Sequence, residues 1–341
     1  MELIFRKIAQ LSASLVFVIL AATAIVLYMS AKPAIEEFGA QFIFEERWGV
    51  EETIELSPSE QAEQDLMKLD NAERSDESAS INENFVEDDD DFIMDDEDDF
   101  VTDDDEESES SSGGSKIIYG ALVPIVGTIF STLIAMFFSI PIAMGIAVFL
   151  SEIAPSALAK SVSVAIELLA SIPSIIYGMW GLFYFGPFIA DLFGGNTVSL
   201  LVAGLILGIM VIPFMAALSR DAISAVPDML KESAYAMGAT KLEVIKDVIF
   251  PYAKSGIVGS IILSFGRALG ETMAVAFVIG GVYQFAGKVT DPTNSIPVVL
   301  ANSFAESSGM SLSVLFYLAL ILFVMSFMVI AVAKYFFLRR K

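Results

Sequence analysis

The stretch from Val226 to Gly256, "VPDMLKESAYAMGATKLEVIKDVIFPYAKSG", decides how this sequence is interpreted. Pro227 suits the first turn of a helix, and Gly238 can end that helix. Residues 240–243 form a capping box for a second helix, which we expect Pro251 to interrupt or end. The pattern predicts two short helices joined by a tight turn, an element suited to docking into a groove of a partner protein.

Long apolar segments lie on both sides of this stretch. About 20 apolar residues cross the hydrocarbon core of a bilayer, and 55% of the chain is hydrophobic, which is a membrane composition. We predict an all-α membrane protein with six transmembrane helices. The first is expected to be retained, because its apolar run of about 22 residues exceeds the ~7–15 of a signal peptide. The predicted spans are about Ile8–Met29, Ile117–Leu150, Val162–Ala190, Val198–Leu218, Ser255–Tyr283 and Leu312–Ala333.

Negative charge is concentrated in one segment. Residues 36–115 hold 31 acidic and three basic residues, whereas the rest of the chain holds 12 acidic and 16 basic residues. Dense like charge with few large apolar side chains cannot bury enough surface to offset the entropy of ordering. We therefore predict a disordered acidic loop after the first helix. Cation capture by its carboxylates is the alternative, although no calcium-loop spacing is present.

Basic residues in the short loops predict the orientation of the chain. Lys and Arg precede the first predicted helix, occupy the loops after the second and fourth, and follow the sixth. The opposite side has Lys288 between the fifth and sixth helices and no base between the third and fourth. Both termini and the Val226–Gly256 stretch are therefore expected in the cytoplasm, and the acidic loop outside.

Several kinds of chemistry are excluded by composition. The chain has no cysteine and no histidine, which removes disulfides, thiol chemistry and the commonest metal ligand. Its one Gly-Lys pair is followed by Val289, so no phosphate-binding loop for ATP is encoded. We expect no catalytic residue, no metal site and no nucleic-acid partner.

Two charged residues lie inside the fifth apolar segment. A charge at mid-bilayer costs at least ~2.5–3.5 kcal/mol, so Arg267 and Glu271 are expected to face a bundle interior or a wet cavity. The guanidinium suits contact with a tetrahedral oxyanion, and a residue four positions on shares its helix face. The two residues either neutralise each other and fix helix packing, or line an anion path. Thr272 and Ser174 are weaker path candidates, because hydroxyls within spans often satisfy backbone groups.

Glu167 is an acid near the end of the third predicted span. It either pairs with a base across a helix interface or lines a gate, and the sequence does not choose between these roles.

The Val226–Gly256 stretch resembles the EAA loop of binding-protein-dependent ABC importer permeases. That loop reads Glu-Ala-Ala, three residues, Gly, nine residues, then Ile-x-Leu-Pro. This chain has Glu232-Ser233-Ala234, then Gly238, then Val248-Ile249-Phe250-Pro251, at the same spacing throughout. The resemblance implies a type I ABC importer permease fold. It also implies that Glu232, Ser233, Ala234, Gly238 and Pro251 contribute to coupling with ATPase subunits.

Two further stretches look like the phosphate importer permeases of that family. They are "GRALGETMAVAFVIGG" (Gly266–Gly281) and "ELLASIPSIIYGMWGLF" (Glu167–Phe183), and the resemblance covers residue 117 to the C-terminus and, weakly, the first helix. It implies a permease domain over residues 116–341 with its coupling loop at 220–254, after an N-terminal helix at 1–35. The long acidic loop at 36–115 departs from the family, whose loop there is shorter and holds a tryptophan that Trp48 matches.

The resemblance also implies partners and a location. A phosphate importer permease works with a homologous permease, with ATPase subunits that bind ATP and Mg, and with an extracytoplasmic phosphate-binding protein, all at a bacterial inner membrane. In this setting Arg267 would attract inorganic phosphate. Glu271 would accept a hydrogen bond from the P–O–H group, which sulfate lacks.

Other functions stay open on the sequence. A permease for sulfate or molybdate would share the fold, and a phosphate sensor could coexist with transport. An ion-coupled secondary anion transporter is the rival from another class. It is disfavoured because such proteins often show two related halves, which are not seen here.

Overall fold

The computed structural model describes residues 2–53 and 115–338, so most of the predicted acidic loop lies outside the described residues. The chain divides into two units, Met1–Trp48 with Tyr119–Lys341, and Gly49–Ile118. The described part of the second unit is an antiparallel strand pair, in which β1 (Val50–Thr53) faces β2 (Ser115–Ile118). The described ends of the acidic segment are therefore ordered, unlike the prediction, because the backbone can pair there.

The first unit is helical. Six helices among its described residues are long and apolar enough to cross a membrane, as predicted. Its elements are α1 (Glu2–Phe38), α2 (Gln41–Phe44), α4 (Leu122–Val148), η1 (Phe149–Ile153), α5 (Ser156–Ala170), α6 (Ser174–Trp180), η2 (Gly181–Phe185), α7 (Gly186–Phe193), α8 (Leu200–Ser224), α9 (Asp228–Ala236), α10 (Lys241–Glu243), η3 (Val244–Ile249), α11 (Phe250–Leu269), α12 (Met273–Ala276), α13 (Ile296–Ser303), η4 (Phe304–Glu306) and α14 (Gly309–Leu338).

The third and fifth spans differ most from their predicted bounds. The third apolar segment is split at residues 171–173, so that α5 is separate and the span is Ser174–Phe193. The split follows from Pro173, which lacks the N–H that a continuous helix needs. The fifth span is Lys241–Leu269 rather than Ser255–Tyr283, because α11 ends just before Gly270.

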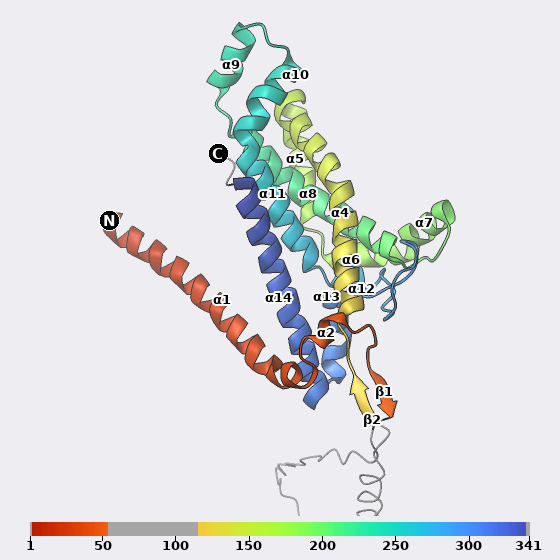
Figure 1. Cartoon of the computed structure of the whole chain (residues 1–341). Coiled ribbons are helices and arrows are strands. Elements are labelled where there is room, and N and C mark those ends of the chain that lie inside the picture. The colour runs from red at the N-terminus through yellow and green to blue at the C-terminus, as the bar shows by residue number, and fades with distance from the viewer. Residues whose placement is uncertain (1, 54–114, 339–341) are drawn as a thin grey trace, which may run out of the picture. The chain divides into compact units, whose positions relative to one another are not determined.

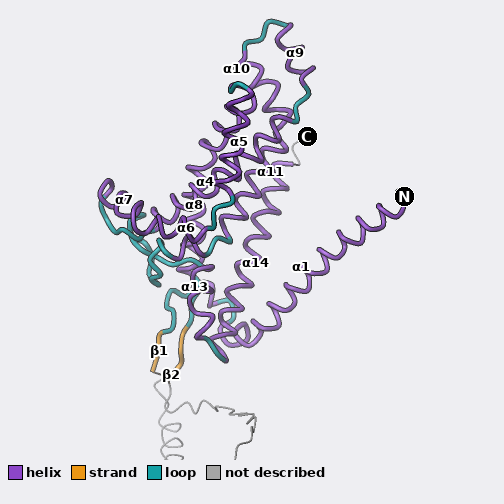
Figure 2. Tube along the Cα trace, turned by 180° about the vertical axis from the view of Figure 1, so that it is seen from behind, coloured by secondary structure: helices purple, strands orange, loops and turns teal. Residues whose placement is uncertain are grey.

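The centre of the unit is the packing of α4 along α8, which lie side by side in Figures 1 and 2. Gly204 and Gly208 on α8 leave room for close approach: a Cβ at Gly204 would lie 2.6 Å from the Ile134 side chain. The Ser139 hydroxyl of α4 donates to the carbonyl oxygen of Gly208 at 3.0 Å. Small residues at such spacing are a common way for helices to associate in lipid.

The first and last helices form a second contact region. Ala31 and Ala34 of α1 are fully buried in a cluster with Val314 and Leu318 of α14. Earlier residues of α1 are largely exposed, and Figure 1 shows the N-terminal part of α1 standing away from α14. The described chain therefore holds α1 through its C-terminal third.

Candidate substrate path and coupling loop

The fifth span ends at the predicted charged pair. Arg267 lies in the last turn of α11, whereas Glu271 lies past its end, beyond Gly270. Glu271 Oε1 accepts a hydrogen bond from the backbone N–H of Ala274 at 3.4 Å, at the start of α12. Thr272 donates its hydroxyl to the Gly270 carbonyl oxygen, also at 3.4 Å. The carboxylate therefore contacts the first turn of a new short helix, α12, instead of following Arg267 on one helix face.

Arg267 has a different neighbour from the one expected. Among the ion pairs of the described residues, none joins Arg267 to Glu271. The guanidinium carbon lies 5.3 Å from the ring centroid of Phe214 on α8, within the range of a cation–π contact. The side chain is exposed in this chain and Glu271 is half-buried. The ion pair between Arg267 and Glu271 that a self-neutralising pair requires is therefore not present among the described residues. The Arg267 guanidinium is accessible in this chain.

The second half of α6 lies beside the start of α12. A Cβ on Gly178 would lie 3.0 Å from the Cα of Ala274, and one on Gly181 would lie 2.9 Å from the Val278 side chain. Matching Gly178 to Ala274 and Gly181 to Val278 shows that the two segments run in the same direction. Ser174, the first residue of α6, and Thr272, which precedes α12, therefore lie at the same end of these two parallel segments.

This arrangement groups the four predicted path residues around two helix interruptions. Ser174 follows the break between α5 and α6, and Thr272 and Glu271 occupy the break between α11 and α12. Arg267 ends the helix that leads into the second break. Interrupted helices within a membrane expose backbone N–H groups and are tolerated where the chain is buried in protein or lines a cavity. Such a place can hold an anion in transit.

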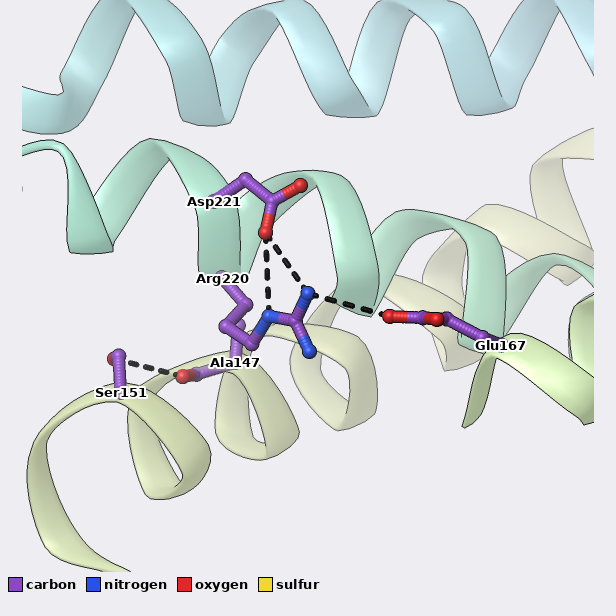
Figure 3. A network of polar contacts seen from close by, with 5 residues as sticks. All are labelled: Ala147, Ser151, Glu167, Arg220 and Asp221. Carbon is purple, nitrogen blue, oxygen red and sulfur yellow. Dashed lines mark hydrogen bonds and ion pairs between the residues drawn. The ribbon is translucent and has the colours of Figure 1, made fainter. Parts of the chain in front are cut away.

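Glu167 pairs with a base across a helix interface, the first of the two roles that the sequence left open. The Arg220 guanidinium of α8 lies 3.6 Å from the Glu167 carboxylate of α5 and 2.9 Å from that of Asp221, as Figure 3 shows. Sequence reasoning placed Arg220 in a loop. The signal that could have kept Arg220 on α8 is that no proline lies between Leu218, the predicted end of the span, and Pro227.

The coupling loop has its predicted first helix and turn. α9 ends shortly before Gly238, whose φ of 90° lies in the left-handed region that a residue with a Cβ rarely adopts. The capping box is present, with Glu243 accepting from the Thr240 backbone N–H at 2.7 Å. The turn and the next helix start are thus fixed by local chemistry.

Pro251 does not end the second helix, which was one of the two expected outcomes; it lies instead where the helical hydrogen-bonding pattern changes. The chain stays helical from Lys241 to Leu269 through α10, η3 and α11, and Pro251 lies in the first turn of α11. The wider π-type turn of η3, just before it, changes the hydrogen-bonding pattern at the point where proline has no N–H to offer. The second coupling helix is therefore the beginning of the fifth span.

The predicted coupling residues differ in exposure. Glu232 and Ser233 are exposed, and so is Gly238. Ala234 packs instead against a buried cluster that includes Val244 and Ile245. Large apolar side chains point outward around them: Met229 and Leu242 are each 73% exposed and Met237 is 89% exposed. An apolar surface of this kind on a short loop is a typical protein-docking site.

Six candidate spans with a helical surface loop between the fourth and fifth define the class of multi-pass helical membrane proteins. Residues 117–339 match the model of the family described as binding-protein-dependent transport system inner membrane component. The chain belongs to this family and is a multi-pass permease subunit.

Relatives of the chain include permeases of phosphate transport systems. The chain is 46% identical over 236 residues to the phosphate transport system permease protein PstC of Haemophilus influenzae, covering 63% of this chain and 75% of that protein. It is 46% identical over 241 residues to PstC of Pasteurella multocida, covering 65% and 75%. A solved structure of the MetNI methionine ABC transporter in inward-facing conformations matches with a TM-score of 0.52 at 20% identity, over 62% of this chain and 91% of that one. This last match supports the type I importer permease fold alone.

Proposed function

We propose that this chain is a permease subunit of an ATP-driven importer of inorganic phosphate. Identity of 46% to PstC proteins over most of the permease domain carries the substrate assignment. The chain works with a homologous permease, with ATPase subunits that bind ATP and Mg, and with an extracytoplasmic phosphate-binding protein. It lies in a bacterial inner membrane with both termini and the coupling loop in the cytoplasm.

The helix interruptions supply the proposed phosphate path. Arg267 offers an accessible guanidinium whose planar donors match two oxygens of a tetrahedral anion. Ser174 and Thr272 add hydroxyls next to the two helix breaks. The contact is transient, because the binding protein sets affinity and the path must release what it receives.

Glu271 supplies the proposed discrimination between phosphate and sulfate. Near neutral pH phosphate keeps a P–O–H donor and sulfate does not. A carboxylate accepts that hydrogen bond and repels an anion that cannot donate. A site that depends on a donor strongly rejects an analogue lacking it.

The coupling loop links this path to ATP. Glu232, Ser233 and Gly238, with Met237 and Leu242 beside them, face away from the chain and form the surface on which an ATPase subunit docks. Because the loop continues directly into α11, a push on the loop is carried along the helix that ends at Arg267.

Uptake of labelled phosphate tests the proposal. The chain is co-expressed with its second permease, ATPase and binding protein in a bacterium that cannot import phosphate. We expect ATP-dependent uptake that excess sulfate does not inhibit. Uptake of sulfate or molybdate instead, in an assembled complex, would assign the chain to another oxyanion. Uptake that persists without the ATPase would indicate an ion-coupled transporter.

A further inference from the structure

The first helix of the coupling loop, α9 (called the coupling helix below), forms an ion pair that the proposed docking to an ATPase subunit does not use. Lys231 Nζ on α9 lies 2.7 Å from Glu152 Oε1 in η1. The two side chains are only 16% and 10% exposed. Asp228 is a second, more distant acid for the same ammonium, at 3.7 Å and 87% exposed. The main contact of Lys231 is therefore the shielded one, made 79 residues away in the sequence.

Glu152 belongs to a different span from those that flank the coupling loop. η1 continues α4 without a break, so the α4–η1 helix runs from Leu122 to Ile153. The chain enters the loop from α8 and leaves it into α11. The Lys231–Glu152 pair thus adds a third connection, from the loop to the helix that packs most extensively along α8.

The other contacts at this place are apolar. Ala147 of α4, Ile223 of α8 and Val244 of η3 are fully buried in one cluster, and Ala234 of α9 packs against it. Apolar contact is not directional, so α9 can slide on such a surface at little cost. A short, shielded, charge-assisted hydrogen bond fixes both distance and direction. Losing Lys231 would leave the shielded Glu152 carboxylate without its ion-pair partner, whereas Lys231 would keep Asp228 at 3.7 Å.

We propose that the Lys231–Glu152 pair is a positioning pair that transmits movement of the coupling helix to α4. When an ATPase subunit moves α9, the pair pulls the end of α4, while the continuous helix from Lys241 to Leu269 carries the movement into α11. The helices α4 and α11 then move together, and α11 carries Arg267 of the proposed path. This inference rests on the proposed function, because it presumes a docked ATPase.

Charge reversal and charge exchange test the pair in the reconstituted complex of both permeases, ATPase and binding protein. The readout is phosphate transported per ATP hydrolysed. Lys231→Glu and Glu152→Lys each place like charges together, and we expect each to lower that ratio by at least about tenfold. The double exchange Lys231→Glu with Glu152→Lys restores opposite charges and should return the ratio to within about threefold of wild type.

The exposed Lys32–Glu36 pair of α1 provides a matched control. Its nitrogen–oxygen distance is 3.5 Å and its side chains are 61% and 68% exposed. Lys32→Glu should leave the transport ratio unchanged, because exposed pairs contribute little. If a single reversal fails to assemble, Lys231→Met with Glu152→Gln removes both charges; it should assemble yet give a lowered ratio.

Two results would overturn the inference. One is a wild-type ratio in assembled Lys231→Glu or Lys231→Met/Glu152→Gln complexes. The other is an exchanged pair that assembles and stays as uncoupled as the single variants. Failure of the proposed function itself is distinguishable, because then the wild-type complex would show no phosphate-dependent ATP use at all.

Discussion

The Arg220 guanidinium of α8 lies 3.6 Å from the Glu167 carboxylate of α5, across an interface between a full span and a helix that ends at a break. Glu167 is 61% exposed, and Arg220 keeps Asp221 as a second partner at 2.9 Å. The contact therefore joins α5 to α8 without burying either carboxylate.

Removing the Glu167 charge should have a small effect on stability. Glu167→Gln is expected to lower the free energy of unfolding by less than about 1 kcal/mol, because exposed ion pairs contribute little. Thermal melting of the purified complex measures the effect, with Asp221→Asn as the comparison. A loss of several degrees in Tm for Glu167→Gln would show that the α5–α8 contact is stronger than its exposure indicates.

A side chain at Gly178 should separate α6 from α12. A Cβ there meets the Ala274 backbone at 3.0 Å, so Gly178→Ala is expected to cost about 1–3 kcal/mol through overpacking and to reduce phosphate uptake. Gly145→Ala is the control, because open space surrounds that position on α4. Uptake and melting are measured on both. Equal behaviour of the two variants would contradict close α6–α12 packing.

A β-branched residue at Gly238 should uncouple ATP hydrolysis from transport. With φ at 90°, valine is strained by about 1–3 kcal/mol, and the turn between α9 and α10 must rearrange. We expect Gly238→Val to lower phosphate transported per ATP at least about fivefold while ATP hydrolysis continues. Gly259→Ala on α11 has an ordinary φ and open space and should couple normally. Full coupling in Gly238→Val would remove the turn from the docking account.

Neutralising Glu271 should weaken the rejection of sulfate. Glu271→Gln removes the repulsion of a fully ionised oxyanion and keeps the shape of the side chain. The preference for phosphate over sulfate in uptake is expected to fall at least about tenfold. Glu306→Gln, at an exposed position in η4, serves as the control. An unchanged preference in Glu271→Gln would show that selectivity arises elsewhere, for example in the binding protein.

Much of the fold was predictable, because the signals are local. Long apolar runs predicted six spans, and Thr240 with Glu243 predicted a helix start that the structure contains. The end of α11 was not predictable in this way. Many helices tolerate a single glycine such as Gly270 in an apolar run. The chain that follows α11 is held by contacts of Ala274 with the Glu271 carboxylate and with Gly178, and Gly178 lies nearly a hundred residues away in the sequence.

The sequence allowed candidate path residues to be proposed, but it did not predict how they are arranged. Arg267 and Glu271 stood out because charges are costly in lipid. The contact of Arg267 with Phe214 and the ion pairs of Glu167 and Glu152 join segments that are distant in sequence. The separation of Arg267 from Glu271 follows from the end of α11 at Leu269. Spacing along one helix carries no information on such contacts.

Phosphate uptake by an Arg267→Ala complex tests the central claim most directly. Arg267→Lys keeps the charge but loses the planar fork, and the amount of assembled complex is measured for each variant. We predict that the alanine variant assembles and loses sulfate-insensitive, ATP-dependent uptake, and that the lysine variant retains part of it. Wild-type uptake in an assembled Arg267→Ala complex would contradict the account, because the guanidinium at the helix break would then have no part in the phosphate path.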